Sequence, residues 1–384
     1  MADKPEVYGG GFFSEPLHVG RPTVADRERF LERVNSILDS GWFTNDGPMV
    51  REFEEKVADH LGVRNCVATC NGTVALELAY RAVGLSGEVI VPSFTFVATV
   101  HALHWQGITP VFCDIDPTTH NIDPVEVERL ITEKTTGIVG VHLWGRPCAI
   151  DSLQEIASHH GLQLVFDAAH AFGCSWNGTR IGNLGSCEVF SFHATKFLHS
   201  FEGGAITTND DQLAEKLRLM RNFGFAGYDT VIHPGVNGKM VEICAAMGLT
   251  NLECIEQLVS ANREYYLAYR ERIAEIPGIE LVTFDESHKP NFQYVVVEID
   301  RETFGLSRDD LVDLLHANNV LARRYFFPGV HRMSPFLAPS GHPPSHLPAT
   351  DEIADRVLSL PVGKAIRQDD IFRVCDLIYS AHAG

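Results

Sequence analysis

The chain has 384 residues, of which 45% are hydrophobic and 21% are charged, as is typical of a globular protein with a sizeable core. This composition excludes a disordered, collagenous or coiled-coil protein. Fifty acidic residues against 31 basic ones give a formal charge of −19, which repels nucleic acids and anionic membranes, so we expect neither as a partner.

No targeting or membrane-spanning signal is evident in the sequence. The longest apolar stretch, residues 89–103, is interrupted by polar residues and is too short to cross a bilayer. The N-terminus lacks the basic patch and apolar run of a signal peptide. Nine scattered cysteines without a Cys-x-x-Cys pair indicate reduced thiols rather than disulfides or a zinc site. We therefore expect a cytoplasmic protein without a metal.

The first elements in chain order are an extended arm and two helices. Residues 1–20, rich in Gly and Pro, predict the arm, and the apolar spacing of residues 23–38 and 50–61 predicts the helices. Short apolar runs then alternate with segments of helical period. The predicted strands are 66–69, 88–91, 110–113, 137–141, 162–166 and 189–192, and the predicted helices between them are 74–82, 98–105, 124–131 and 150–159.

This alternation predicts an α/β fold, with a mainly parallel sheet covered by helices on both faces. Ligands of such sheets bind at the carboxyl ends of the strands, so the residues directly after each strand are the candidates for chemistry. After residue 252 the pattern changes to an α+β one. Helices are predicted at 252–276, 308–317 and 369–380, and strands at 292–298 and 320–322. We predict a large domain over residues 1–252 and a smaller one over residues 253–384.

Three motifs follow predicted strands. Asn71-Gly72-Thr73 joins a strand to a helix, where N–H groups and a hydroxyl can bind phosphate, or where the Asn simply caps the helix. Asp167 ends an apolar run and suits a cationic ring nitrogen, a metal or a turn cap. Lys196 follows another apolar run, and is either a reactive amine or a lysine that extends to the surface.

Together the three motifs match the needs of pyridoxal 5′-phosphate. The phosphate would lie at the helix N-terminus, the carboxylate would keep the ring nitrogen protonated, and the lysine would bind the cofactor covalently. An aromatic side chain should stack on the ring. Phe94 and Phe96, after the second predicted strand, are candidates for this role, with core packing as the alternative for both.

The chain resembles the DegT/DnrJ/StrS aminotransferases, which act mostly on nucleotide-linked ketosugars. Its motifs occur in the same order and at the same spacing as in that family. The matching motifs include CNGTVAL at 70–76, PSFTF at 92–96, DAAHAFG at 167–173, SFHATK at 191–196 and EGGA at 202–205, with further matches at 42–48, 111–117, 141–145 and 358–361. The resemblance runs from about residue 9 to residue 378. It implies the aspartate-aminotransferase fold and a homodimer with shared active sites.

The resemblance also implies roles for individual residues. Lys196 would be the Schiff-base lysine and Asp167 the partner of the ring nitrogen. The remaining cofactor contacts would be Gly72, Thr73 and Ser191 at the phosphate, Phe96 on the ring, His170 near the 3-hydroxyl, and Asn237 reaching the phosphate from the other subunit.

Departures from the family pattern concern the substrate contacts. Gly238 and Lys239 stand where an aromatic residue and Arg are common, and Cys244 replaces a common Gln. The stretch 322–331 resembles the subgroup that makes 4-amino-4,6-dideoxyglucose on a dTDP carrier. We expect substrate contacts from Thr44, Lys239, Arg323, Arg324, Tyr325 and His331. The two arginines could instead form a surface charge pair with nearby acids, Tyr325 could belong to the core, and His331 could be structural.

The sequence thus predicts a pyridoxal-phosphate-dependent transamination. L-glutamate would donate the amino group to dTDP-4-keto-6-deoxy-D-glucose, with Lys196 as the general base. A 3-ketosugar or aminocyclitol aminotransferase shares all the cofactor residues and stays an alternative. A sugar dehydratase of the same family carries His in place of the lysine, and a regulatory protein would lack the Lys or the Asp, so both are disfavoured.

Overall fold

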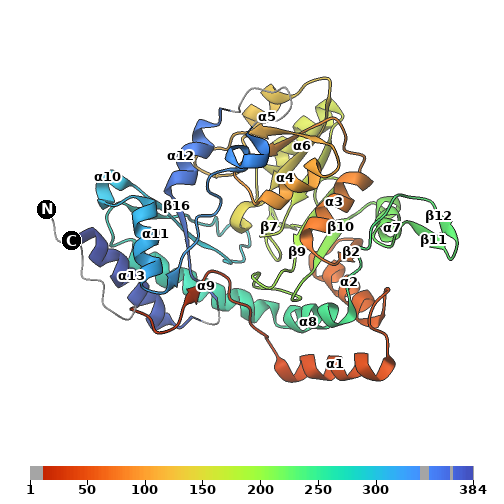
Figure 1. Ribbon diagram of the computed structural model, residues 1–384, viewed down its shortest axis with the longest axis horizontal. Coiled ribbons are helices and arrows are strands. Elements are labelled where there is room, and N and C mark those ends of the chain that lie inside the picture. Colours follow the sequence, from red (N-terminus) through yellow and green to blue (C-terminus); the bar gives the residue numbers. More distant parts are fainter. Residues whose placement is uncertain (1–11, 338–345, 364–365, 384) are drawn as a thin grey trace.

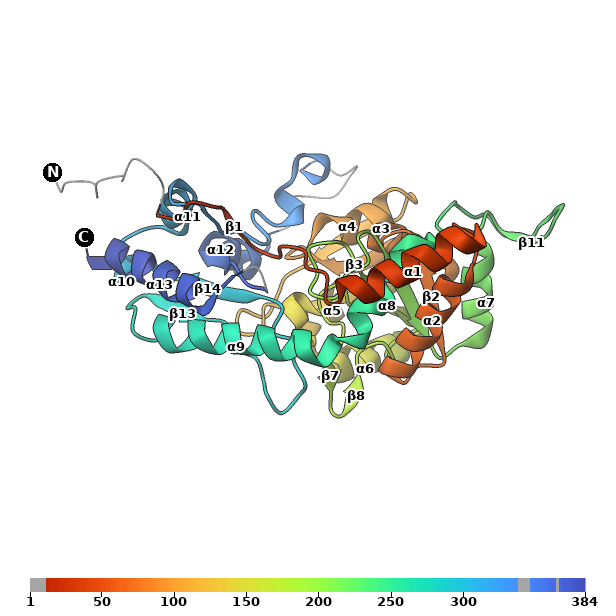
Figure 2. The ribbon, with the colours of Figure 1, turned by 90° about the horizontal axis from the view of Figure 1, so that it is seen from below.

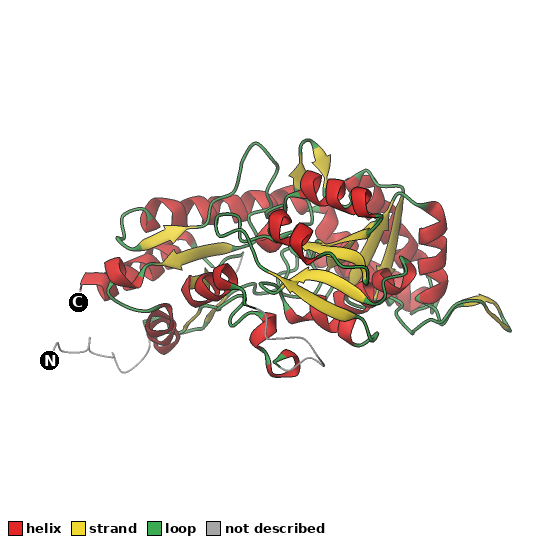
Figure 3. Ribbon diagram, turned by 90° about the horizontal axis from the view of Figure 1, so that it is seen from above, coloured by secondary structure: helices red, strands yellow, loops and turns green. Residues whose placement is uncertain are grey.

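The computed structural model in Figure 1 describes residues 12–337, 346–363 and 366–383. Its centre is a seven-stranded sheet, drawn in yellow in Figure 3. The strand order is β2 (Asn65–Thr69), β10 (Gly204–Thr208), β9 (Cys187–Ser191), β6 (Gln163–Asp167), β5 (Thr135–Val141), β3 (Glu88–Pro92) and β4 (Thr109–Cys113). Only β10 runs antiparallel to its neighbours, so the predicted α/β fold with a mainly parallel sheet is confirmed.

Helices cover both faces of this sheet because alternate strand residues point to opposite sides. Val67 and Val165 pack with α3 (Gly72–Ala82), α4 (Val97–His104) and α7 (Asp211–Met220). Their neighbours Ala68 and Phe166 pack on the other face. That face is covered by α2 (Pro48–Leu61), α5 (Pro124–Leu130), α6 (Ile150–His160) and α8 (Glu242–Glu253).

The C-terminal part has its own apolar core around a three-stranded antiparallel sheet. The strands, in order, are β13 (Ile279–Leu281), β14 (Val295–Ile299) and β16 (Val357–Leu360). The helices of this part are α9 (Ile255–Ile273), α10 (Arg301–Phe304), α11 (Arg308–Ala317), α12 (Pro348–Arg356) and α13 (Gln368–Ala383). The division at residue 252/253 stays a prediction.

Of the predicted N-terminal arm, residues 12–20 lie within the described residues. They pack against the C-terminal part: β1 (Leu17–His18) pairs in parallel with β15 (Val320–Leu321), and Phe13 joins the same core as Leu17. The arm then leads to α1 (Arg27–Ser40), which lies beside α8 (Figure 2). The N-terminal arm and β15, three hundred residues apart in sequence, therefore lie side by side.

Two predictions about secondary structure were wrong in detail. The helix expected over 252–276 is the end of α8 followed by α9, with a break at Cys254, whose backbone is not helical. The strand expected at 292–298 begins only at Val295. The elements that the sequence did not predict include β10, α7, α12, β16 and all but the end of α8.

Three 3-10 helices, η1 (Leu143–Gly145), η2 (Val330–Arg332) and η3 (Ser334–Phe336), and two short hairpins complete the described elements. The hairpins are formed by β7 (Ser175–Trp176) with β8 (Thr179–Arg180), and by β11 (Phe225–Gly227) with β12 (Thr230–Val231). The second hairpin projects away from the body of the molecule in Figure 2. Among the described residues, no helix combines the length and apolar character needed to cross a bilayer.

Candidate active site

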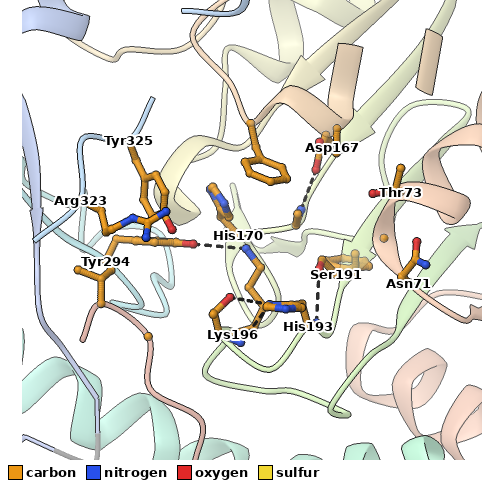
Figure 4. A pocket seen from close by; sticks show the side chains of 18 of the residues that line it. Asn71, Thr73, Asp167, His170, Ser191, His193, Lys196, Tyr294, Arg323 and Tyr325 are labelled. Carbon is orange, nitrogen blue, oxygen red and sulfur yellow. Dashed lines mark hydrogen bonds between the residues drawn. The ribbon is translucent and has the colours of Figure 1, made fainter. Parts of the chain in front are cut away.

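A cavity of about 980 Å³ lies at the carboxyl ends of β6 and β9, where the large sheet meets the C-terminal part (Figure 4). Its wall comes from the N-terminus of α3, the loops after β6 and β9, the N-terminal arm, and the segments around residues 294 and 325. The cavity brings together these predicted residues: Gly72, Thr73, Phe96, Asp167, His170, Ser191, Lys196, Arg323 and Tyr325.

Asp167 is the last residue of β6, and its side chain is only 6% exposed. One carboxylate oxygen accepts from the Thr99 hydroxyl at 2.8 Å and the other from the Ala169 N–H at 3.0 Å. Burial raises the pKa of Asp167, while these hydrogen bonds and the positive charge of Lys196 oppose that rise. The site therefore holds a fixed carboxylate that gains strongly from a cationic partner.

Lys196 lies in the loop after β9, and its Nζ donates to the Tyr294 hydroxyl at 3.3 Å (Figure 4). Burial lowers the pKa of Lys196 to about 8, although Asp167 and Tyr325 act in the opposite direction. An amine with this pKa is partly neutral near pH 7.5, and only the neutral form attacks carbonyls or takes a proton. Lys196 is thus suited to be a nucleophile and a base.

The N-terminus of α3 forms a binding site for an anion. Asn71 caps the helix by accepting from the Val74 N–H at 2.8 Å, so the N–H groups of Gly72 and Thr73 lie in the first turn, where they have no partner within the helix. Ser191 faces Gly72, and a Cβ on Gly72 would lie only 3.0 Å from the Ser191 Cβ. A side chain at position 72 would therefore crowd Ser191 and narrow this cradle.

His170 lies in the cavity wall, with its ring stacked on Phe326 at a centroid distance of 5.8 Å. Its Nδ1 accepts from the Trp144 N–H at 3.1 Å, which leaves the proton of the neutral ring on Nε2. Burial lowers the pKa of His170 well below its usual range, so the ring is neutral. It can therefore donate one hydrogen bond from Nε2.

Of the two aromatic candidates, only Phe96 lines the cavity, and it is 54% exposed. Phe94 is buried, packing edge-on against Trp144 and Phe326. The alternative of core packing thus holds for Phe94, and the exposed ring of Phe96 is free to stack on a ligand.

The cavity has groups that match both the phosphate and the ring of pyridoxal phosphate. The α3 cradle with Ser191 matches the phosphate, and the buried carboxylate of Asp167 matches a protonated ring nitrogen. Lys196 would offer an amine to the aldehyde group, and His170 would offer a hydrogen-bond donor to the ring hydroxyl.

Three predicted residues lie at the surface outside this cavity. The Asn237 side-chain oxygen accepts from Lys239 Nζ at 2.7 Å, and both residues belong to the loop that precedes α8. The Thr44 carbonyl accepts from the Trp42 indole N–H at 2.7 Å. None of the three reaches the cavity of its own chain.

Two more predicted residues are held by partners elsewhere. Arg324 pairs with Asp309 at 3.0 Å. His331 is buried: its Nδ1 lies 2.6 Å from the Ser93 hydroxyl and its Nε2 lies 3.1 Å from Asp351. For His331 these contacts match a structural role instead of a substrate contact. For Arg324 they match an ion pair at the surface.

Thr99, Tyr294 and Arg21 were not predicted from the sequence, yet the structure brings them to the site. Thr99 holds Asp167, Tyr294 contacts Lys196, and Arg21 of the N-terminal arm lines the cavity. Thr95, just before α4, and Thr99, in the first turn of α4, were a usable signal because they are four residues apart and their hydroxyls lie 2.9 Å apart. Nothing local marks Tyr294 or Arg21.

Comparison with known proteins agrees with this geometry. The sequence profile of the DegT/DnrJ/EryC1/StrS aminotransferase family matches residues 24–379. The dTDP-4-amino-4,6-dideoxy-D-glucose transaminase of Escherichia coli is 36% identical over 94% of this chain and 98% of its own length. The GDP-perosamine synthase of Caulobacter vibrioides is 35% identical, over 93% and 96%.

Solved structures similar to this chain also include an enzyme with a TDP-sugar product and an aminotransferase. A crystal structure of DesI in the presence of its TDP-sugar product is 51% identical, with a TM-score of 0.93 over 98% of this chain and 95% of that one. Helicobacter pylori PseC, an aminotransferase involved in pseudaminic acid biosynthesis, superposes with a TM-score of 0.90 at 26% identity, over 96% and 100%. The chain belongs to the DegT/DnrJ/EryC1/StrS aminotransferase family and is a sugar aminotransferase.

Proposed function

We propose that this enzyme uses pyridoxal phosphate to transfer the amino group of L-glutamate to dTDP-4-keto-6-deoxy-D-glucose, in the reducing cytoplasm that its nine free thiols indicate. The product would be dTDP-4-amino-4,6-dideoxy-D-glucose. The observation that carries the proposal is the meeting of Lys196, Asp167 and the N-terminus of α3 in one cavity.

Each cofactor contact has a proposed role. Gly72, Thr73 and Ser191 bind the phosphate, and Phe96 stacks on the ring. Asp167, held by Thr99 and Ala169, keeps the ring nitrogen protonated. When bound, the cofactor supplies an electron sink that stabilises negative charge at the carbon that loses its proton.

Lys196 then carries the proton in both halves of the reaction. In the first half its neutral amine takes the proton from the α-carbon of the donor, and one water molecule supplies the carbonyl oxygen of the 2-oxo acid that leaves while the amino group stays in the site. In the second half it returns a proton to the sugar carbon that receives nitrogen. Tyr294 holds Nζ of Lys196 at 3.3 Å and so keeps the amine directed into the cavity.

The identity of the sugar is proposed from the relatives. Two dTDP-4-amino-4,6-dideoxy-D-glucose transaminases, from Escherichia coli and Shigella dysenteriae, are 36% and 37% identical. A dTDP-3-amino-3,6-dideoxy-α-D-galactopyranose transaminase of Aneurinibacillus thermoaerophilus is 35% identical, which keeps a 3-ketosugar as the second candidate. Arg323 and Tyr325, which line the cavity, are the residues we expect to contact the substrate.

We further propose that two chains form a homodimer with shared active sites. Apolar side chains near Asn237 and Lys239 are unusually exposed, among them Phe43, Phe223 and Val241 at 56%, 45% and 39%. A partner that covered this surface would bring its own Asn237 and Lys239 toward the cavity. Light scattering in solution tests the dimer, and a monomer at micromolar concentration contradicts it.

The visible spectrum of the protein loaded with pyridoxal phosphate is the first test of the activity. A yellow band that L-glutamate bleaches, and that is absent in Lys196→Ala, supports the cofactor, the lysine and the donor together. The glutamate-treated enzyme is then offered dTDP-4-keto-6-deoxyglucose and its 3-keto isomer, with products identified by mass spectrometry. Amination of the 3-keto isomer alone would overturn the proposed substrate, and unchanged transamination by Lys196→Ala would overturn the mechanism.

A further inference from the structure

The cavity wall contains two arginines, Arg21 and Arg323. Within the described part of the chain, no carboxylate oxygen lies within 4.0 Å of either guanidinium, whereas the adjacent Arg324 pairs with Asp309. Both arginines are exposed, so their guanidinium groups are open to a ligand that enters the cavity.

The N-terminal arm is fixed on both sides of Arg21. Before it, Gly20 has φ +73° and packs against the Thr195 carbonyl so closely that a Cβ would lie 2.5 Å from that oxygen. After it, the Thr23 carbonyl accepts from the His199 ring at 2.8 Å. Both contacts are to the loop that carries Lys196, so Arg21 is held at the edge of the reactive site.

Arg323 is fixed independently. Its backbone exchanges hydrogen bonds of 3.0 and 2.8 Å with Ser359, and its guanidinium lies 5.2 Å from the centre of the Tyr325 ring. Figure 4 shows this side chain beside Tyr294 and Tyr325, on the same side of the site as Lys196. The stacked guanidinium keeps its N–H groups available to a ligand in the cavity.

The cavity wall contains three carboxylates, those of Asp167, Glu202 and Glu15, and none of them lies within 4.0 Å of the two guanidinium groups. Asp167 is engaged by Thr99 and Ala169, and Glu202 lies 3.6 Å from the His193 ring. Glu15, also in the wall, is one further carboxylate against the two guanidinium groups. The phosphate cradle at α3 is a separate site, built from N–H groups and a hydroxyl instead of arginines.

We propose that Arg21 and Arg323 together form an anion subsite that binds the oxyanion group of an incoming substrate. The proposal rests on the proposed function, in which one cavity admits two substrates in turn. Both carry such a group, a carboxylate on the amino donor and a diphosphate on the nucleotide sugar. Guanidinium groups bind both through paired N–H donors. The N-terminal arm, which the sequence suggested only as an extended segment, thereby becomes part of the active site.

The test uses the enzyme loaded with pyridoxal phosphate, so that the cradle at α3 is filled, and Arg21→Gln and Arg323→Gln variants. Inorganic pyrophosphate and dTDP are titrated by calorimetry, and the L-glutamate dependence of bleaching is measured separately. Arg27→Gln is the control, since Arg27 is an exposed arginine of α1 outside the cavity. We expect both cavity variants to bind pyrophosphate at least about tenfold more weakly, with the control unchanged.

The separate titrations identify which oxyanion the subsite holds. Weaker dTDP binding with unchanged glutamate dependence assigns it to the diphosphate, the reverse assigns it to the carboxylate, and loss of both shows that the substrates share it. A wild type that binds no pyrophosphate, or variants that bind it like the wild type, would overturn the subsite. If pyrophosphate binding is lost in the variants but the wild type ignores glutamate and aminates no ketosugar, the subsite stands and the proposed function falls.

Discussion

Replacing Asp167 by Asn removes the buried negative charge while preserving the shape of the side chain. Asp167 is 6% exposed, and hydrogen bonds from Thr99 and Ala169 fix its carboxylate at the end of β6. A hydrogen bond to a charged group in such a place contributes about 1.5–3 kcal/mol, which corresponds to a loss of roughly 10- to 150-fold in rate. We expect this loss in the bleaching of the cofactor band by L-glutamate, measured by stopped-flow absorbance.

The same variant has a second, independent readout in the cofactor-free protein. The charge of Asp167 raises the pKa of Lys196, so its removal should lower that pKa below about 8. At pH 7.5 an amine with a pKa of about 8 is roughly one-quarter neutral, against about 0.1% for the ordinary value of 10.5. The midpoint for labelling of Lys196 by an amine-reactive reagent, followed by mass spectrometry, should therefore move to lower pH.

Thr99→Val is the matched control, because it removes one hydrogen bond to Asp167 and keeps the charge. It should give a smaller loss of rate than Asp167→Asn. A wild-type bleaching rate in Asp167→Asn, with the variant folded and loaded with cofactor, would refute the role of the carboxylate.

Three further variants test the cradle, the buried histidine and the core. Gly72→Ala places a Cβ 3.0 Å from that of Ser191, and should weaken cofactor binding about tenfold or more in a fluorescence titration; wild-type affinity would exclude a phosphate in this cradle. Ser93→Ala removes the hydroxyl that contacts His331 at 2.6 Å, and should cost about 1–3 kcal/mol in urea unfolding without changing the bleaching rate. Phe53→Ala empties a fully buried position under the sheet and should cost about 3–5 kcal/mol in the same assay, so a loss below 1 kcal/mol would contradict the core described above.

Asp167 and Lys196 are the part of the site that can be predicted from the sequence, because their places depend only on where two strands end. Asp167 and Lys196 each follow an apolar strand, and the carboxyl ends of parallel strands meet at one edge of a sheet. Their approach to a common cavity could therefore be expected without any knowledge of long-range contacts. The helix start at Asn71 was predictable in the same way, because its capping role depends on residues three positions away.

What the sequence could not predict depends on contacts between distant segments. Arg21 reaches the cavity only because the arm pairs with β15, some three hundred residues later. The helix α8 has buried residues around its whole circumference, so it lacks the one-sided period that identifies a surface helix. Arg323 and Arg324 look equivalent as a pair of arginines, yet the backbone bridge to Ser359 directs one to the cavity and the other to Asp309.

The side chains suited to the cofactor and those expected to contact the substrate come from different parts of the chain. The groups suited to the cofactor come from the large sheet and its loops: the N-terminus of α3, Asp167 and Lys196. Arg323 and Tyr325 come from the C-terminal part, and Arg21 from the arm that packs on it. Replacements at Tyr325 should therefore change the preference between 4-keto and 3-keto sugars while glutamate still bleaches the cofactor band. If Tyr325→Phe instead slowed bleaching and left the preference between the two ketosugars unchanged, this division of labour would be wrong.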